Sequence, residues 1–209
     1  MRQARELVAH RLCAVDPLAH HLLTQAYNNA WANHRLLGAC MTLSRAEFEA
    51  PRTGFFPSIK ATLNHNLTVD WYYIDAIKRS RSGAPPNADF LAFFEPEQPF
   101  DTCGALHVAQ TVSDRQLIAV CEALDTAALA SKVAVPRRAG VHIEPIVRLL
   151  AHLFQHQTHH RGQAHGMLSA TRVAPPQLDE FFCANETALR VADFTALGFS
   201  EAAIWPRAE

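Results

Sequence analysis

Cysteine is scarce and scattered in this chain, which excludes a disulfide framework. The five cysteines among 209 residues are odd in number, lie far apart and form no CxxC pair. The same spacing provides no zinc knuckle. We expect buried thiols in a reducing cytoplasm. The five are Cys13, Cys40, Cys103, Cys121 and Cys183.

Excess charge and long apolar runs are lacking as well. The formal net charge is -1 and the isoelectric point is about 6.9, so nothing favours electrostatic capture of nucleic acid or of an anionic membrane. No apolar stretch approaches the roughly 20 residues that span a bilayer. The N-terminal MRQARELVAHRLCAVD lacks the apolar core of a signal peptide. We therefore expect a cytoplasmic protein with no nucleic-acid partner and no membrane partner.

Four long segments carry apolar residues at helical spacing, which predicts an all-α fold. Asp16 is suited to cap the first segment, over 16–44, and Pro17 suits its first turn. The second segment covers 56–80, and the prolines of SGAPPNAD end it. A chain of 209 residues, 49% of them hydrophobic, can bury one sizeable core. We therefore predict a single domain over 1–209.

The second half of the chain is predicted to form two more long helices. We expect residues 89–110, which are rich in phenylalanine, to form an irregular connection packed on the other helices. Thr111 and Asp114 resemble a capping box at the start of the third helix. The run KVAVPRRAGVHIEP is expected to include a short extended piece before the fourth helix, over 144–170. This pattern predicts a four-helix bundle with short extra helices at the C-terminus.

Five of the twelve histidines fall in one run of the fourth helix, RLLAHLFQHQTHHRGQAHGML. An α-helix turns about 100° per residue, so His156 and His160 fall within roughly 60° of Leu153, on the stripe that faces the core. Residues four apart are neighbours on a helix, so these two imidazoles can share one ion. The other three histidines fall further round the helix: His152, His159 and His165.

A pair of imidazoles is an incomplete site, because catalytic zinc usually has three protein ligands and one open position. His65, in ATLNHNLTVDWYY, is the best third candidate, since Val69 and Tyr72 put it on a partly apolar face. Metal sites in bundles are built from inward side chains on facing helices. No glutamate lies between His156 and His160, so the metalloprotease pattern HExxH is absent. The same histidines can also be interpreted as hydrogen-bonded core residues without a metal.

Three stretches, YNNAWANHRLL, FFPSIKATLNHNLTVDWYY and HQTHHRGQAHGML followed by PPQLDEF, resemble the DinB/YfiT-like family of bacterial metal-binding bundles. The resemblance extends from about Leu18 to Phe182. It is specific because LNH and HxxxHRGQ agree in both order and separation. It implies an up-down-down-up four-helix bundle, commonly a homodimer, with a divalent metal ion held by His65, His156 and His160.

The resemblance leaves three interpretations of function open. In the first, the protein is a metal-dependent enzyme, because related members are thiol S-transferases that use low-molecular-weight thiols, or a thiol-dependent isomerase. A thiol next to a cation loses its proton and can attack an electrophile, and water activated in the same way would give a hydrolase. In the second, the protein is a metal-binding or stress-response module without turnover. In the third, the histidines are only structural.

Three imidazole nitrogens suit several divalent ions. We expect zinc or nickel first, then manganese or iron, together with a low-molecular-weight thiol or another small-molecule substrate. Asp70 and Asn64 are candidates to orient an imidazole or a substrate. Trp71 and Tyr72 are candidates to line the pocket. Gly162 falls opposite the core stripe, where a small residue is expected to permit close contact with another element.

Overall fold

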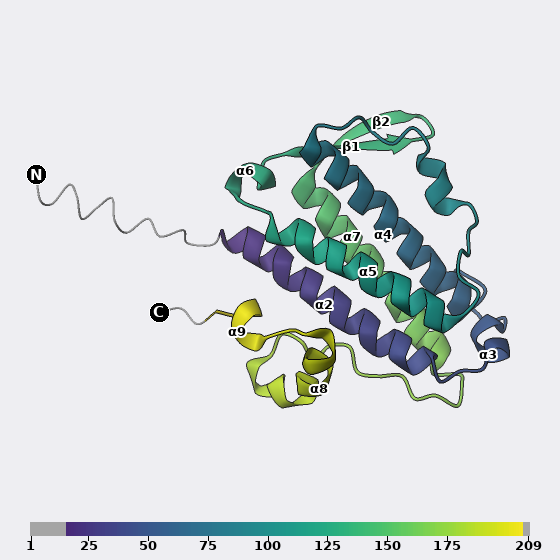
Figure 1. Cartoon of the computed structure of the whole chain (residues 1–209). Coiled ribbons are helices and arrows are strands. Elements are labelled where there is room, and N and C mark those ends of the chain that lie inside the picture. Colours follow the sequence, from purple (N-terminus) through teal and green to yellow (C-terminus); the bar gives the residue numbers. More distant parts are fainter. Residues whose placement is uncertain (1–15, 207–209) are drawn as a thin grey trace, which may run out of the picture.

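The computed structural model describes residues 16–206, and four long helices make up nearly half of this part (Figure 1). Helix α2 packs on both α5 and α7, and α4 packs on the same two helices. The prediction of a mostly helical fold is confirmed. The N-terminal segment examined for a signal peptide, and Cys13 with it, lie outside the described residues. The long helices are α2 (Pro17–Cys40), α4 (Ile59–Ser82), α5 (Cys103–Glu122) and α7 (Ile146–Leu168).

Short elements occupy the connections and the C-terminal end. The extended piece expected before the fourth long helix is an antiparallel hairpin of β1 (Lys132–Arg137) and β2 (Gly140–Pro145), and β1 packs on α4. The C-terminal helices α8 (Thr187–Leu197) and α9 (Glu201–Ile204) pack on α2. The remaining short helices are α3 (Arg45–Glu49), η1 (Phe90–Phe94), α6 (Thr126–Leu129) and η2 (Ala184–Glu186).

Helix α5 begins well before the position that the sequence suggested. Thr102 caps it, because its side chain accepts a hydrogen bond from the backbone N–H of Ala105 at 3.3 Å. Thr111 lies inside the helix, where its hydroxyl donates to the carbonyl of His107, and Asp114 is buried. The predicted capping box is therefore wrong. The segment CGALHVAQ has helical spacing, but the irregular phenylalanine-rich stretch before it obscured the start.

The other long helices agree more closely with the prediction. Asp16 caps α2, since its carboxylate accepts from the backbone N–H groups of Leu18 and Ala19. This helix ends at Cys40, because Ser44 starts the separate helix α3. Helix α4 begins after its cap Ser58, and α7 differs from the predicted range by two residues at each end.

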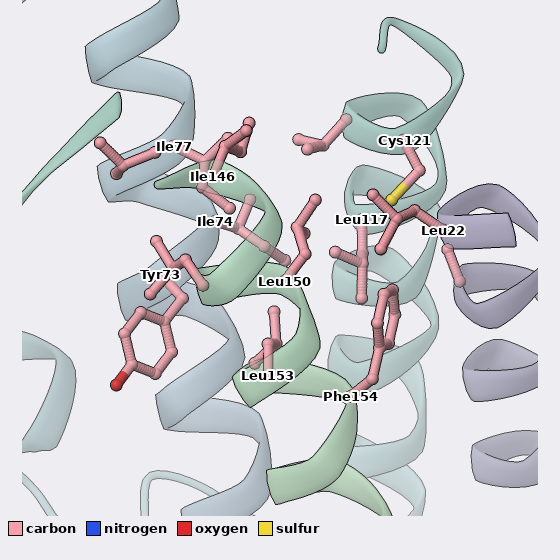
Figure 2. Close-up of a cluster of buried hydrophobic side chains, with 14 of the residues drawn as sticks. Leu22, Tyr73, Ile74, Ile77, Leu117, Cys121, Ile146, Leu150, Leu153 and Phe154 are labelled. Atoms are coloured by element: carbon pink, nitrogen blue, oxygen red, sulfur yellow. The ribbon is translucent and has the colours of Figure 1, made fainter. Parts of the chain in front are cut away.

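The hydrophobic core consists of two main clusters with polar residues between them. One cluster joins the beginnings of α2 and α7 to the later turns of α4 and α5, and Figure 2 shows part of it, including Ile77, Leu117 and Leu150. The second joins the opposite ends of these helices. Buried polar residues from all four helices lie between the clusters: Asn29, Asn33, Asn66, Asp70, Gln110, Asp114, Gln157 and Arg161.

Four cysteines lie within the described residues, and all four are free thiols. Cys40, Cys103 and Cys121 are buried, as the sequence predicted. Cys183 is exposed, so the expectation of a buried thiol is wrong there. Within residues 16–206, none of the helices combines the length and the apolar character needed to cross a membrane.

Candidate metal centre

Three histidines from two helices meet where α4 packs on α7. His65 lies on α4, and His156 and His160 lie one turn apart on α7. Their ring centroids are 5.1 Å apart for His65 and His156, 4.8 Å for His65 and His160, and 4.4 Å for His156 and His160. One nitrogen of each lies within 4.8 Å of the other two. The structure therefore brings together the three residues that the sequence singled out.

An amide pair next to the histidines fixes how α4 and α7 face each other. Asn66 Nδ2 donates to Gln157 Oε1 at 2.6 Å, and Gln157 Nε2 donates back to the Asn66 carbonyl at 3.3 Å. Each amide is the sequence neighbour of a histidine, and both amides are buried. Because a buried amide without partners is costly, this pair holds His65 opposite His156.

Gln163 orients the third imidazole. Its Nε2 lies 3.1 Å from His159 Nε2 and donates to it, since an amide nitrogen has no acceptor capacity. Its Oε1 lies 2.8 Å from His160 Nδ1 and accepts a hydrogen bond from the N–H there. A neutral imidazole with its proton on Nδ1 has its lone pair on Nε2. His160 is thus held in the tautomer whose Nε2 can bind a cation.

Burial favours the neutral form of all three imidazoles. Burial, followed by the charge of His160, lowers the pKa of His65 to about 4. Burial, followed by neighbouring histidines, lowers the pKa of His156 to about 3. Burial also lowers the pKa of His160, against the opposing effect of its hydrogen bond with Gln163. Neutral imidazole is the form that ligates metal ions.

The donor set fits a divalent ion. His65 Nε2 and His156 Nε2 lie 3.1 Å apart, so their lone pairs repel unless a proton or a cation lies between them. Two nitrogens bound to one tetrahedral zinc ion are separated by roughly 3.3 Å. His156 Nδ1 is buried and has no hydrogen-bond partner among the described residues. No hydrogen bond at Nδ1 therefore fixes the His156 imidazole in a different orientation. The three side chains are compatible with a shared ion.

A cavity of about 540 Å³ opens beside His65. Phe56, from the connection before α4, lines this cavity, and its ring centroid lies 4.4 Å from that of His65 and 5.4 Å from that of His160. Tyr72 also lines the cavity, as expected. Trp71 does not, because it packs on Phe100 and borders a different hollow.

Three expected supporting roles are not found. Asp70 accepts a hydrogen bond from Gln110 at 2.8 Å and is not bonded to the imidazoles. The Asn64 side chain bonds the backbone of Phe100 instead. Gly162 is exposed, and a Cβ there would meet nothing within 4 Å, so it permits no close contact with another element.

Gln163 and Phe56 contact the histidines but were not among the residues predicted from the sequence. Gln163 had a usable signal, because it lies three residues after His160 and such residues are neighbours on a helix. Phe56 had none, since its position over the rings depends on the course of the connection between α3 and α4. The exposure of His152 and His159 agrees with their predicted place away from the core stripe.

The fold and the site define a mostly helical protein with a three-histidine cluster between two of its long helices. The model of the DinB family matches residues 19–190, which include all three histidines, and the chain belongs to that family. None of the curated proteins compared with the sequence matches it.

Proposed function

We propose that this protein binds a divalent ion through His65, His156 and His160 and acts as a metal-dependent enzyme of thiol S-transferase or hydrolase type. The observation that carries the proposal is the convergence of three neutral imidazoles beside a cavity large enough for a small molecule. Zinc or nickel is the first choice of ion, then manganese or iron. An ion held there would favour the deprotonated form of a thiol or water bound to it.

The chain's own residues have separate tasks in this proposal. The three imidazoles hold the ion without cancelling its charge, because they are neutral. Gln163 fixes the orientation of His160 through the hydrogen bond to Nδ1. Phe56 covers one side of His65 and His160 and excludes water from that side. The substrate enters through the cavity beside His65.

We extend the proposal to the whole molecule as one domain in an up-down-down-up arrangement. Contacts between helix ends support it. Asp16, which caps the start of α2, accepts a hydrogen bond from Thr126, just after the end of α5, so these helices run in opposite directions. Arg81, late in α4, bonds the Ala123 carbonyl just after α5, so α4 and α5 run in the same direction. A homodimer in the cytoplasm, without a nucleic-acid partner, completes the proposal.

Metal analysis of the untagged protein tests the site. We expect about one divalent ion per chain after incubation with Zn²⁺ or Ni²⁺. His65→Ala, His156→Ala and His160→Ala should each weaken binding at least tenfold, because each removes one of three ligands. His152→Ala is the matched control on the exposed side of α7 and should bind like the parent. Metal content well below one ion per chain in the loaded parent would refute the site.

A metal-binding module without turnover is the second candidate. It is favoured because, within residues 16–206, no carboxylate forms an ion pair with any of the three imidazoles to serve as a proton acceptor. Metal-loaded protein can be assayed with a panel of thiols and a chlorodinitrobenzene acceptor. A rate above the spontaneous one that is lost in His156→Ala supports the enzyme. A rate equal to the spontaneous one across the panel favours the module.

A further inference from the structure

The cavity beside His65 is long enough for a ligand with two distinct ends. His65, Thr68 and Tyr72 line it from successive turns of α4. Seven residues of helix cover about 10 Å, so the Tyr72 end of the cavity lies about 10 Å from His65. An aromatic ring with a short side chain spans roughly this distance. Phe90 and Phe94 of η1 add apolar wall to the cavity. These dimensions and this lining suit a small apolar body lying along α4.

A guanidinium group lies at the Tyr72 end of the cavity. Arg137, the last residue of β1, has its Cζ 5.4 Å from the ring centroid of Tyr72 and 5.6 Å from that of Tyr73. It also donates to the hydroxyl of Tyr73 at 3.0 Å. The hydroxyl of Tyr72 donates to the carbonyl of Pro136, which ties the hairpin to the same ring. Arg137 is therefore held in position without any ligand.

Arg137 has unused hydrogen-bonding capacity. Within residues 16–206, no carboxylate lies within 4.0 Å of its side-chain nitrogens. A guanidinium has five N–H donors, and the bond to Tyr73 uses one of them. A planar guanidinium with open donors matches a carboxylate through two parallel hydrogen bonds. The guanidinium of Arg137 is exposed and has donors available for a carboxylate at this end of the cavity.

We infer that the cavity selects small organic acids, with the carboxylate on Arg137, an apolar or aromatic body against η1, and the reacting group toward His65. This deepens the proposed function, on which the assignment of the reacting end rests. Two exposed carboxylates, Glu95 and Glu97, also line the cavity. Because they repel an anion, the acid group depends on direct hydrogen bonds to Arg137 for its binding.

Three probes with the same phenyl body and different charges test this inference on metal-free protein. They are 3-phenylpropionate, the neutral 3-phenylpropanamide and the cationic 3-phenylpropylamine, titrated by ligand-observed NMR. We expect the acid to bind at least fivefold more tightly than the amide, and the amine most weakly. Arg137→Gln should remove the preference for the acid, because it deletes the charge. Arg138→Gln, the neighbouring arginine of the same cavity, is the matched control and should retain the preference.

The outcomes separate this inference from the proposed function. An acid preference in the parent that is lost only in Arg137→Gln supports the inference, and the comparison of acid with amide needs no variant to fold. Equal binding of acid and amide, or loss of the preference in Arg138→Gln instead, overturns it. Because the titrations use metal-free protein, a parent that binds metal without preferring the acid refutes this inference alone. A parent that prefers the acid without binding metal refutes the proposed function alone.

Discussion

At the scale of single residues, one side chain decides which nitrogen of His160 faces its neighbours. Gln163 donates to His159 and accepts from His160 Nδ1, so its two hydrogen bonds fix both the amide and the imidazole. His159 is exposed and would not be recognised as part of a metal site from its own position. It takes part only by holding the Gln163 amide in one orientation.

We predict that Gln163→Leu weakens metal binding roughly 10-fold to 100-fold, which is typical for loss of a hydrogen bond to a ligand imidazole. The change removes the acceptor for His160 Nδ1 but leaves all three imidazoles in place. A competition assay with a chromogenic zinc chelator measures the affinity. Gln155→Leu, on an exposed position of the same helix, is the matched control and should be neutral. Unchanged affinity in Gln163→Leu would show that His160 is oriented by packing alone.

The three histidines could be found from the sequence because helical periodicity is a local property. The 100° step put His156 and His160 on the core stripe, and the apolar neighbours of His65 did the same on the earlier helix. The residues around them were not predictable in this way. Phe56 and Arg137 reach the site from a connection and a hairpin, and the path of such segments depends on contacts between residues distant in the sequence.

At the scale of elements, the start of α5 shows where local patterns mislead. Both Thr102 and Thr111 precede plausible helical sequence, and each has a hydroxyl that can accept or donate. Only Thr102 has the extended backbone of a cap, with its side chain accepting from the N–H of Ala105. Thr111 bonds backward to the carbonyl of His107 within the helix. Two threonines in one helix therefore make opposite kinds of hydrogen bond.

We predict that Thr102→Ala lowers the free energy of unfolding by about 1 kcal/mol, the usual cost of removing an N-cap side chain. Thr111→Ala serves as the matched control. It should cost less than half as much, because a hydroxyl that bonds back to a helix carbonyl adds little to helix stability. Urea unfolding followed by circular dichroism measures both. An equal or larger loss in Thr111→Ala would contradict the assignment of the cap.

At the scale of the whole molecule, the polar layer between the two core clusters joins all four long helices. Asp114 of α5 accepts hydrogen bonds from Asn29 and Asn33 of α2 at 3.2 and 2.9 Å, and from Gln110 at 3.0 Å. Arg161 of α7 donates to the same two asparagines. The layer lies at the level of the histidines, since Arg161 directly follows His160 in the chain. Buried polar groups of this kind require a specific alignment of the helices.

The layer contains two carboxyl groups and only one cation. Burial lowers the pKa of Arg161 to about 10, so it remains charged at neutral pH. Asp114 has three amide donors, whereas Asp70 has one from Gln110, and its Oδ1 has no partner among the described residues. Burial, followed by the charge of Asp114, raises the pKa of Asp70 to about 7. Burial raises the pKa of Asp114 less, to about 6, so Asp70 is the carboxyl that holds its proton more strongly.

This difference makes the stability of the fold depend on pH through Asp70. Its pKa in the folded state lies above the ordinary value of 3.8, so the stabilising contribution is complete below about pH 4 and is lost as the pH rises toward 7. The pKa of Asp70 in the folded state lies about two units above pH 5, and each unit corresponds to roughly 1.4 kcal/mol of stability. The parent should lose roughly 3 kcal/mol through this group between pH 5 and pH 8.

We predict that Asp70→Asn abolishes this loss, because an amide of the same shape does not ionise. Urea unfolding measures the free energy of unfolding of parent and variant at pH 5 and pH 8. The stability of the variant relative to the parent should rise by about 2 kcal/mol or more from pH 5 to pH 8. Asp75→Asn is the matched control on the same helix, where Asp75 pairs with Arg79 near the surface at 3.0 Å. The same pH dependence in the parent and in Asp70→Asn would mean that Asp70 is already ionised in the folded protein at pH 5. The polar layer would then hold two carboxylates against Arg161.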